Sequence, residues 1–179
     1  MRIFKKKLTP EELGGLIYEA LRASMASEGG LSIQRYVDSL DKNMSDLHSQ
    51  YVGEIMLGCM FGAVLAIERS TSKWIAGRVY SGMKGEFFRH LQEQGATPAQ
   101  ITEWDVVIQD HFQGYRRSLD GYEGFEPPWK LGRKFYWNVT GVEEYIAMSI
   151  KISTLYILEA RDIAQKLLNE HGPTLTAEP

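Results

Sequence analysis

The chain of 179 residues has a single cysteine and no strong excess of either charge. Cys59 has no second cysteine to pair with, so an intrachain disulfide is excluded, and its apolar neighbours predict a buried side chain rather than a reactive thiol. The 20 lysines and arginines nearly balance the 23 acidic residues, which leaves a net charge of −3. This balance creates no global field that attracts nucleic acid, so nucleic acid is not an expected partner.

Long hydrophobic runs are also missing. The most apolar stretch, residues 55–67, is shorter than the roughly 20 residues that cross a bilayer, so we expect no transmembrane segment. The basic start of the chain leads into a polar helix start at Thr9 instead of an apolar stretch, so we expect no signal peptide. Together with the single cysteine, these features predict a cytoplasmic protein.

Catalytic and metal-binding motifs are absent from the sequence too. It has no Glu-x-x-His pair of the kind that di-iron bundles use, no Gly-x-Ser-x-Gly turn and no phosphate-binding Walker loop. Glu86 and His90 lie four residues apart, but this spacing is typical of a surface pair, and no third or fourth metal ligand accompanies them. We therefore predict no catalytic residue, no metal and no cofactor.

Helix starts are the clearest feature that is present. A threonine followed three residues later by Glu or Gln forms a capping box, in which each side chain satisfies a backbone N–H at the helix start. The sequence has three such pairs: Thr9 with Glu12, Thr97 with Gln100, and Thr140 with Glu143. Proline follows the first two threonines, where it fits the first helical position. We predict a helix start at each threonine.

Apolar residues at helical spacing extend these starts into a fold. The pattern predicts helices over the following ranges: 9–28, 33–40, about 45–70, about 72–94, from 97 onward, and 140–171. Whether residues 32–70 form one helix or two is left open. Gly58, Gly62 and Ala66 recur every four residues, which predicts a close helix crossing in the core. The predicted fold is all-α, a single-domain bundle of five to six helices over residues 1–172, with a disordered tail at 173–179.

One segment, residues 121–139, shows no clear helical spacing and is predicted as a long aromatic-rich connecting loop. It is crowded with aromatic residues and cations, and it contains a Pro-Pro pair at 127–128. A loop of this length must bury something to stay ordered, so its rings are expected to pack against the bundle. Two alternatives are a protein-contact surface, because Trp, Tyr and Arg dominate interface hot spots, and a ligand site with arginines on a phosphate or carboxylate.

His111 is the most interesting titratable residue, because it lies on the apolar stripe of the fifth predicted helix. There it could act as an acid, a base or a hydrogen-bond donor to a ligand. The more common alternative is a core histidine that is satisfied by a backbone or side-chain acceptor. The neighbouring Asp110 points elsewhere, since adjacent helical residues diverge by about 100°.

These observations favour a non-enzymatic helical protein that acts through protein contact, as a homodimer or with another protein. The residues predicted to bind the partner or a ligand are His111, Arg116, Arg117, Trp129, Arg133, Lys134 and Trp137. One alternative is a small-molecule sensor or carrier, with a pocket between the third, fifth and last helices in which His111 or Arg116 holds a polar group. A further alternative is an acid/base or metal-dependent enzyme that uses His111, His90 and Glu86.

Overall fold

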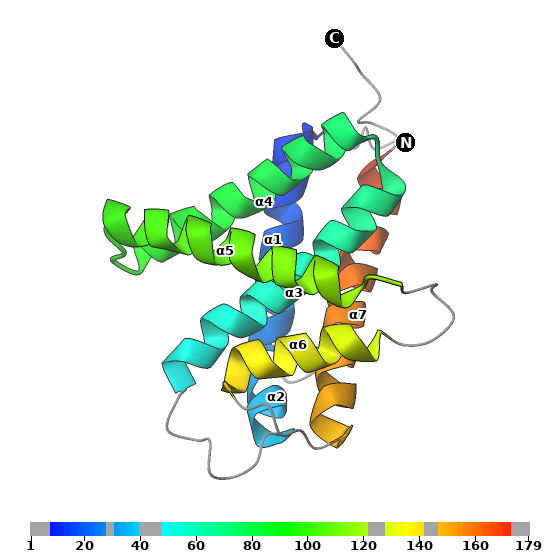
Figure 1. Ribbon diagram of the computed structural model, residues 1–179. Coiled ribbons are helices and arrows are strands. Elements are labelled where there is room, and N and C mark those ends of the chain that lie inside the picture. Colours follow the sequence, from blue (N-terminus) through cyan, green and yellow to red (C-terminus); the bar gives the residue numbers. More distant parts are fainter. Residues whose placement is uncertain (1–7, 28–30, 40–47, 122–127, 142–146, 173–179) are drawn as a thin grey trace.

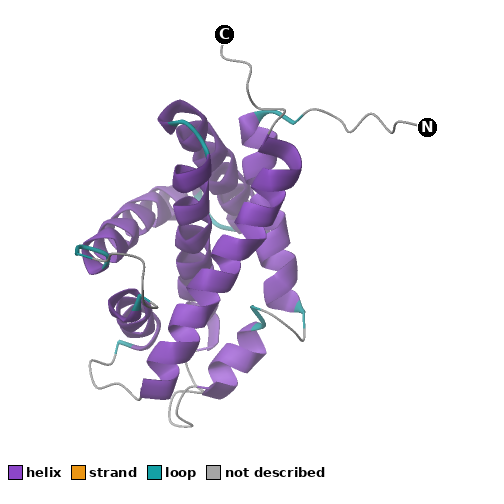
Figure 2. Cartoon of the chain, turned by 90° about the vertical axis from the view of Figure 1, so that its right-hand side faces the viewer, coloured by secondary structure: helices purple, strands orange, loops and turns teal. Residues whose placement is uncertain are grey.

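Helices account for nearly all of the residues that the computed structural model describes, which are 8–27, 31–39, 48–121, 128–141 and 147–172. Within these ranges there are seven helices and no strand (Figures 1 and 2). The helices are α1 (Pro10–Ala26), α2 (Ile33–Ser39), α3 (His48–Ser70), α4 (Lys73–Glu93), α5 (Pro98–Ser118), α6 (Trp129–Thr140) and α7 (Ala147–His171). The predicted all-α class is confirmed. Within the same ranges, no helix combines the length and apolar character needed to span a bilayer.

Two of the three predicted capping boxes are confirmed. The Thr9 Oγ1 atom accepts a hydrogen bond from the Glu12 backbone N–H at 3.1 Å, and the Glu12 carboxylate accepts one from the Thr9 N–H at 2.8 Å. Thr97 and Gln100 form the same reciprocal pair at the start of α5. Each pair satisfies two backbone donors that the first helical turn would otherwise leave unpaired.

The third predicted box, at Thr140, stays a prediction. Thr140 is the last residue of α6, and its hydroxyl donates a hydrogen bond to the Tyr136 carbonyl at 2.8 Å. Gly141 follows in the left-handed conformation, with φ at 69°, which is a common way to end a helix. Thr140 is therefore the last residue of α6, and the structure describes the next helix from Ala147 onward. Glu143 lies outside the described residues.

The predicted loop at 121–139 is wrong from Trp129 onward, because this part forms α6. Residues 122–127 lie outside the described residues. The buried face of α6 has helical spacing, with Leu131, Phe135 and Val139 four residues apart. The helix start has no side-chain cap, so the start signal that α1 and α5 carry is missing here. Within residues 32–70 the structure describes α2 and α3, and residues 40–47 between them lie outside the described part of the chain.

The helices pack in close pairs, α1 with α4 and α7 with both α3 and α6 (Figure 1). Small residues make the closest approaches possible. At the α3–α7 crossing, a Cβ added to Gly62 would overlap the Ile157 carbonyl oxygen and lie 3.2 Å from the Ala160 Cβ. Ala66 is also buried. The core crossing predicted from the spacing of small residues in α3 is therefore confirmed.

Buried tyrosines tie the short helix α2 to the core. The Tyr36 ring lies 4.9 Å from the Tyr156 ring and 5.5 Å from the Phe135 ring, between centroids. Its hydroxyl shares a hydrogen bond of 2.8 Å with the Ser153 Oγ, and the Tyr156 hydroxyl donates to the Ser32 carbonyl at 2.5 Å. Both rings bury large apolar area while their hydroxyls keep partners.

Buried tyrosines also predict a loss of stability at alkaline pH. Burial raises the pKa of Tyr18, Tyr80 and Tyr156 from the ordinary value of 10.0 to about 12. The folded protein keeps these protons at a pH where the unfolded chain releases them. Stability is therefore fully present below pH 10 and falls as the pH rises toward about 12. We expect one cooperative transition in which tyrosinate absorbance and loss of helical circular dichroism coincide. Gradual tyrosinate formation in a fully helical protein would contradict this expectation.

Candidate functional site

Four of the predicted site residues share one surface on α6. Trp129, Arg133 and Trp137 follow one another at intervals of four residues, so they form a single stripe along the helix. Lys130 and Lys134 lie beside this stripe, and the five residues together are called the α6 outer face. Trp129 is 43% exposed and Trp137 is 42% exposed, so both rings remain accessible on the folded chain.

The α6 outer face is positively charged. Its lysines and arginine are the only charged residues of α6, while the whole chain carries a net charge of −3. The Lys134 ammonium lies 3.6 Å from the centroid of the Trp137 ring, which is a close cation–π contact. Burial lowers the pKa of Lys134, and the nearby negative charge of Glu54 partly opposes this shift. The Lys134 cation and the Trp137 ring are therefore in direct contact on this face.

The opposite side of α6 holds the outer face in place. Phe135 is fully buried, and its ring contacts the Gly58 backbone of α3 so closely that a side chain there would overlap it. Its centroid lies 5.5 Å from that of Tyr36 and 6.5 Å from that of Tyr115. Gly132 packs against Thr154 of α7. Packing against α2, α3, α5 and α7 gives the exposed rings a rigid support, which lowers the entropy lost when they bind a partner.

His111 lies in the contact between α5 and α3. Its Nδ1 atom is 2.9 Å from the Val107 carbonyl oxygen, which can only accept, and its Nε2 atom is 2.8 Å from the Glu54 carboxylate. The side chains of His111 and Glu54 are each 21% exposed. Both ring nitrogens therefore face acceptors within the protein, so His111 links two helices. No sequence pattern pointed to Glu54 as its partner, because only the fold brings the two residues together.

The two arginines of α5 that were predicted to bind a partner or ligand also differ in their surroundings. Arg116 donates two hydrogen bonds to the Glu68 carboxylate of α3, at 3.0 and 2.5 Å. This forked contact raises the pKa of Arg116. Arg116 also lines a groove between α3, α4 and α5. Arg117 is exposed near the C-terminus of α5, where a cation interacts favourably with the helix dipole.

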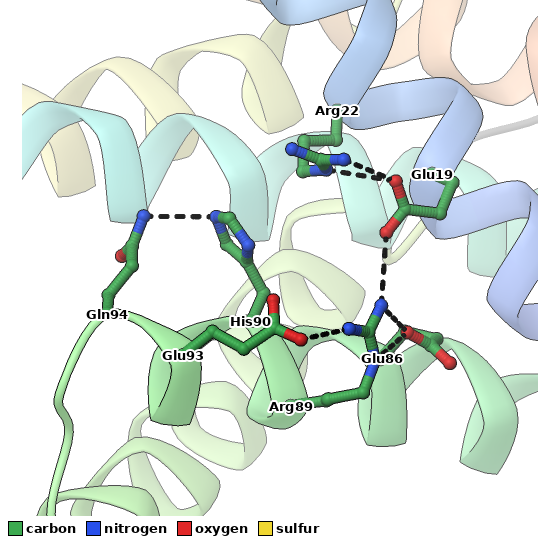
Figure 3. Close-up of polar contacts among 7 residues, drawn as sticks. All are labelled: Glu19, Arg22, Glu86, Arg89, His90, Glu93 and Gln94. Atoms are coloured by element: carbon green, nitrogen blue, oxygen red, sulfur yellow. Dashed lines mark hydrogen bonds and ion pairs between the residues drawn. The ribbon is translucent and has the colours of Figure 1, made fainter.

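The possible metal pair Glu86 and His90 belongs to a surface network between α1 and α4 (Figure 3). Arg89 is the centre of this network and contacts the carboxylates of Glu86, Glu93 and Glu19. His90 Nε2 lies 3.1 Å from the side-chain nitrogen of Gln94. Each member of the pair thus has a protein contact. In the described ranges, no three His, Cys, Asp or Glu residues are grouped so that they could hold a metal ion.

Comparison with family models, curated proteins and solved structures finds no match for this chain. Its function is therefore inferred from the geometry of the fold alone.

Proposed function

We propose that this protein acts through contact with another protein, and that the α6 outer face binds an acidic segment of that partner. One observation carries the proposal. Trp129 and Trp137 are partly exposed on a packed helix, on either side of Arg133 and beside two lysines. A cytoplasmic location is part of the proposal, because the composition predicts it.

The residue types of the α6 outer face favour protein recognition. Trp and Arg are the side chains most enriched among interface hot spots, where a few anchors supply most of the binding free energy. Eight residues of helix separate the two tryptophans by about 12 Å along the axis. A helix or an extended segment can contact both rings at that separation. Because α6 is already packed, only the exposed side chains need to become ordered.

The charge of the α6 outer face selects the kind of partner. Three cations without an acid on the same helix attract carboxylates, and this attraction would raise the association rate and weaken in salt. A symmetric contact between two copies of α6 would instead bring six cations together. The homodimer predicted from the sequence therefore requires α6 to meet a different, acidic surface of the second copy. A different protein with an acidic segment could bind the α6 outer face without requiring such a second surface on this chain.

Removing both tryptophans is expected to weaken binding of an acidic peptide. The probe is a fluorescein-labelled peptide of glutamate, leucine and phenylalanine residues, and fluorescence anisotropy gives its Kd. Trp129→Ala combined with Trp137→Ala should raise the Kd at least about tenfold, since a hot-spot side chain contributes roughly 2 kcal/mol or more. Trp74→Ala is the matched control, because Trp74 is 44% exposed on α4 and should leave the Kd unchanged.

Two results would count against the proposal. One is equal binding by the double variant and the wild type. The other is equal weakening by Trp74→Ala, which would indicate non-specific adhesion to exposed rings. Native mass spectrometry without the peptide tests the second copy as the partner. A dimer that dissociates only in the double variant would identify the acidic surface as part of the same chain. Binding to anionic vesicles but not to the peptide would reassign α6 to a membrane surface.

A further inference from the structure

A groove of about 880 Å³ lies between α3, α4 and α5. This volume falls within the roughly 300–1,000 Å³ that is typical of small-molecule sites. None of its lining residues belongs to α6, so the groove is separate from the α6 outer face. Its position also differs from the predicted pocket, which involved the last helix in place of α4. Arg116 is the predicted ligand-binding residue that lines it.

The inner lining of the groove is apolar and partly aromatic. Val64 and Ile67 from α3, Ala76 from α4 and Phe112 from α5 are buried residues with surface on the groove. Tyr80 adds a second ring, whose centroid lies 5.9 Å from that of Phe112 with a 44° angle between the planes. A flat ring in the ligand could pack against these two rings in a tilted or edge-on arrangement.

The charged residues of the lining cancel one another. Glu68 and Asp110 are negative, while Lys73 and Arg116 are positive. The forked contact between Arg116 and Glu68 neutralises one pair within the protein. A charged ligand would therefore lose its hydration without meeting a net opposite charge, which is unfavourable. Gln109 and Gln113, the neutral polar residues contributed by α5, can each donate and accept a hydrogen bond.

We propose that this groove binds a small neutral molecule that has an aromatic ring and one hydrogen-bonding end. The ring contacts Tyr80 and Phe112, and the polar end reaches the glutamines of α5. Volume, apolar lining and balanced charge support this class of ligand. The inference is independent of the proposed role of α6, since it uses other residues and another face of the fold.

Two fluorescent probes with the same ring system test the ligand class. N-phenyl-1-naphthylamine is neutral and carries one N–H donor, and 8-anilinonaphthalene-1-sulfonate adds a negative charge to the same skeleton. We expect the neutral probe to bind the full chain with increased fluorescence. The sulfonated probe should bind at least about tenfold more weakly, because its charge must be desolvated. Equal or tighter binding of the sulfonated probe would overturn the neutral class.

Substitutions of two glycines in α4 test whether the neutral probe binds in the groove. Gly77 lines the groove, and a Cβ built there meets no atom within 4 Å, so Gly77→Phe should place a ring in the groove without disturbing the backbone. Gly85 has the same open surroundings two turns later and lies outside the groove. Gly77→Phe should raise the Kd of the neutral probe at least about tenfold, since a filled pocket excludes it. Gly85→Phe should leave that Kd unchanged.

Circular dichroism on both variants shows whether each remains folded, and equal thermal midpoints make the comparison direct. Absence of any fluorescence increase with the wild type would overturn the proposal. Equal binding of the neutral probe to the wild type and Gly77→Phe would overturn it as well, because the probe would then occupy another surface.

Discussion

Gly62→Ala is expected to destabilise the protein by about 3 kcal/mol, even though alanine is the better helix former. The new Cβ would overlap the Ile157 carbonyl oxygen at the crossing of α3 and α7. A backbone atom cannot rotate away as a flexible side chain can, so the two helices must separate. Separation exposes apolar surface on both of them. Urea denaturation followed by circular dichroism measures the change in the free energy of unfolding.

Gly85→Ala is the matched control for this substitution. Gly85 also lies within a helix, but a Cβ there meets nothing within 4 Å. Alanine should therefore stabilise the protein by roughly 0.5–1 kcal/mol, through the lower backbone entropy of the unfolded chain. Opposite signs at the two glycines would support the close crossing. The same stabilisation at both positions would show that α3 and α7 do not approach as closely as described.

Phe135→Ala is expected to cost about 4 kcal/mol of stability, because the loss of a fully buried ring leaves a cavity. The ring is 0% exposed and lies among Gly58, Tyr36 and Tyr115, at the junction of α6 with the rest of the core. The substitution tests directly whether residues 129–140 form a packed helix. Chemical denaturation gives the free energy, and the slope of the transition shows whether unfolding stays cooperative.

Trp137→Ala on the same helix provides the comparison. Trp137 has a larger ring but is 42% exposed, so its removal should cost only about 1–2 kcal/mol, from the half-buried ring and its contact with Lys134. The position of each ring, and not its size, should determine the effect. Equal losses at Phe135 and Trp137 would contradict the assignment of one buried and one exposed face to α6.

Patterns among residues close in sequence were sufficient to predict much of the fold. Thr9 and Thr97 were recognisable as helix starts because a capping box involves residues only three positions apart. The spacing of Gly58 and Gly62 also predicted close packing in the core, which the structure shows for both residues. Such signals involve only residues close in sequence, so they can be recognised without knowledge of the tertiary contacts.

The failure at α6 has a physical explanation. Its buried face has regular helical spacing, yet Trp129 and Trp137 on the exposed face are also large and aromatic. In addition, Pro128 precedes the helix and no side chain caps its start, so the start signal that marked α1 and α5 is missing here.

The site could be predicted only in part. Trp129, Arg133, Lys134 and Trp137 were chosen for their residue types, and one helix brings them onto one surface. The contact of His111 with Glu54 could not be foreseen, since it joins residues on separate helices. The groove beside Arg116 is likewise formed by three helices that the sequence does not place relative to one another.

The most direct test of the proposed role of α6 uses the tryptophan indole N–H signals in a proton–nitrogen correlation spectrum. The chain has four tryptophans, so each signal reports on one known position. Titration with the acidic probe peptide should shift the signals of Trp129 and Trp137, while those of Trp74 and Trp104 stay in place. Added salt should reverse the shifts. Unchanged signals at Trp129 and Trp137, or shifts confined to Trp74, would contradict the proposal that the α6 outer face is the binding surface.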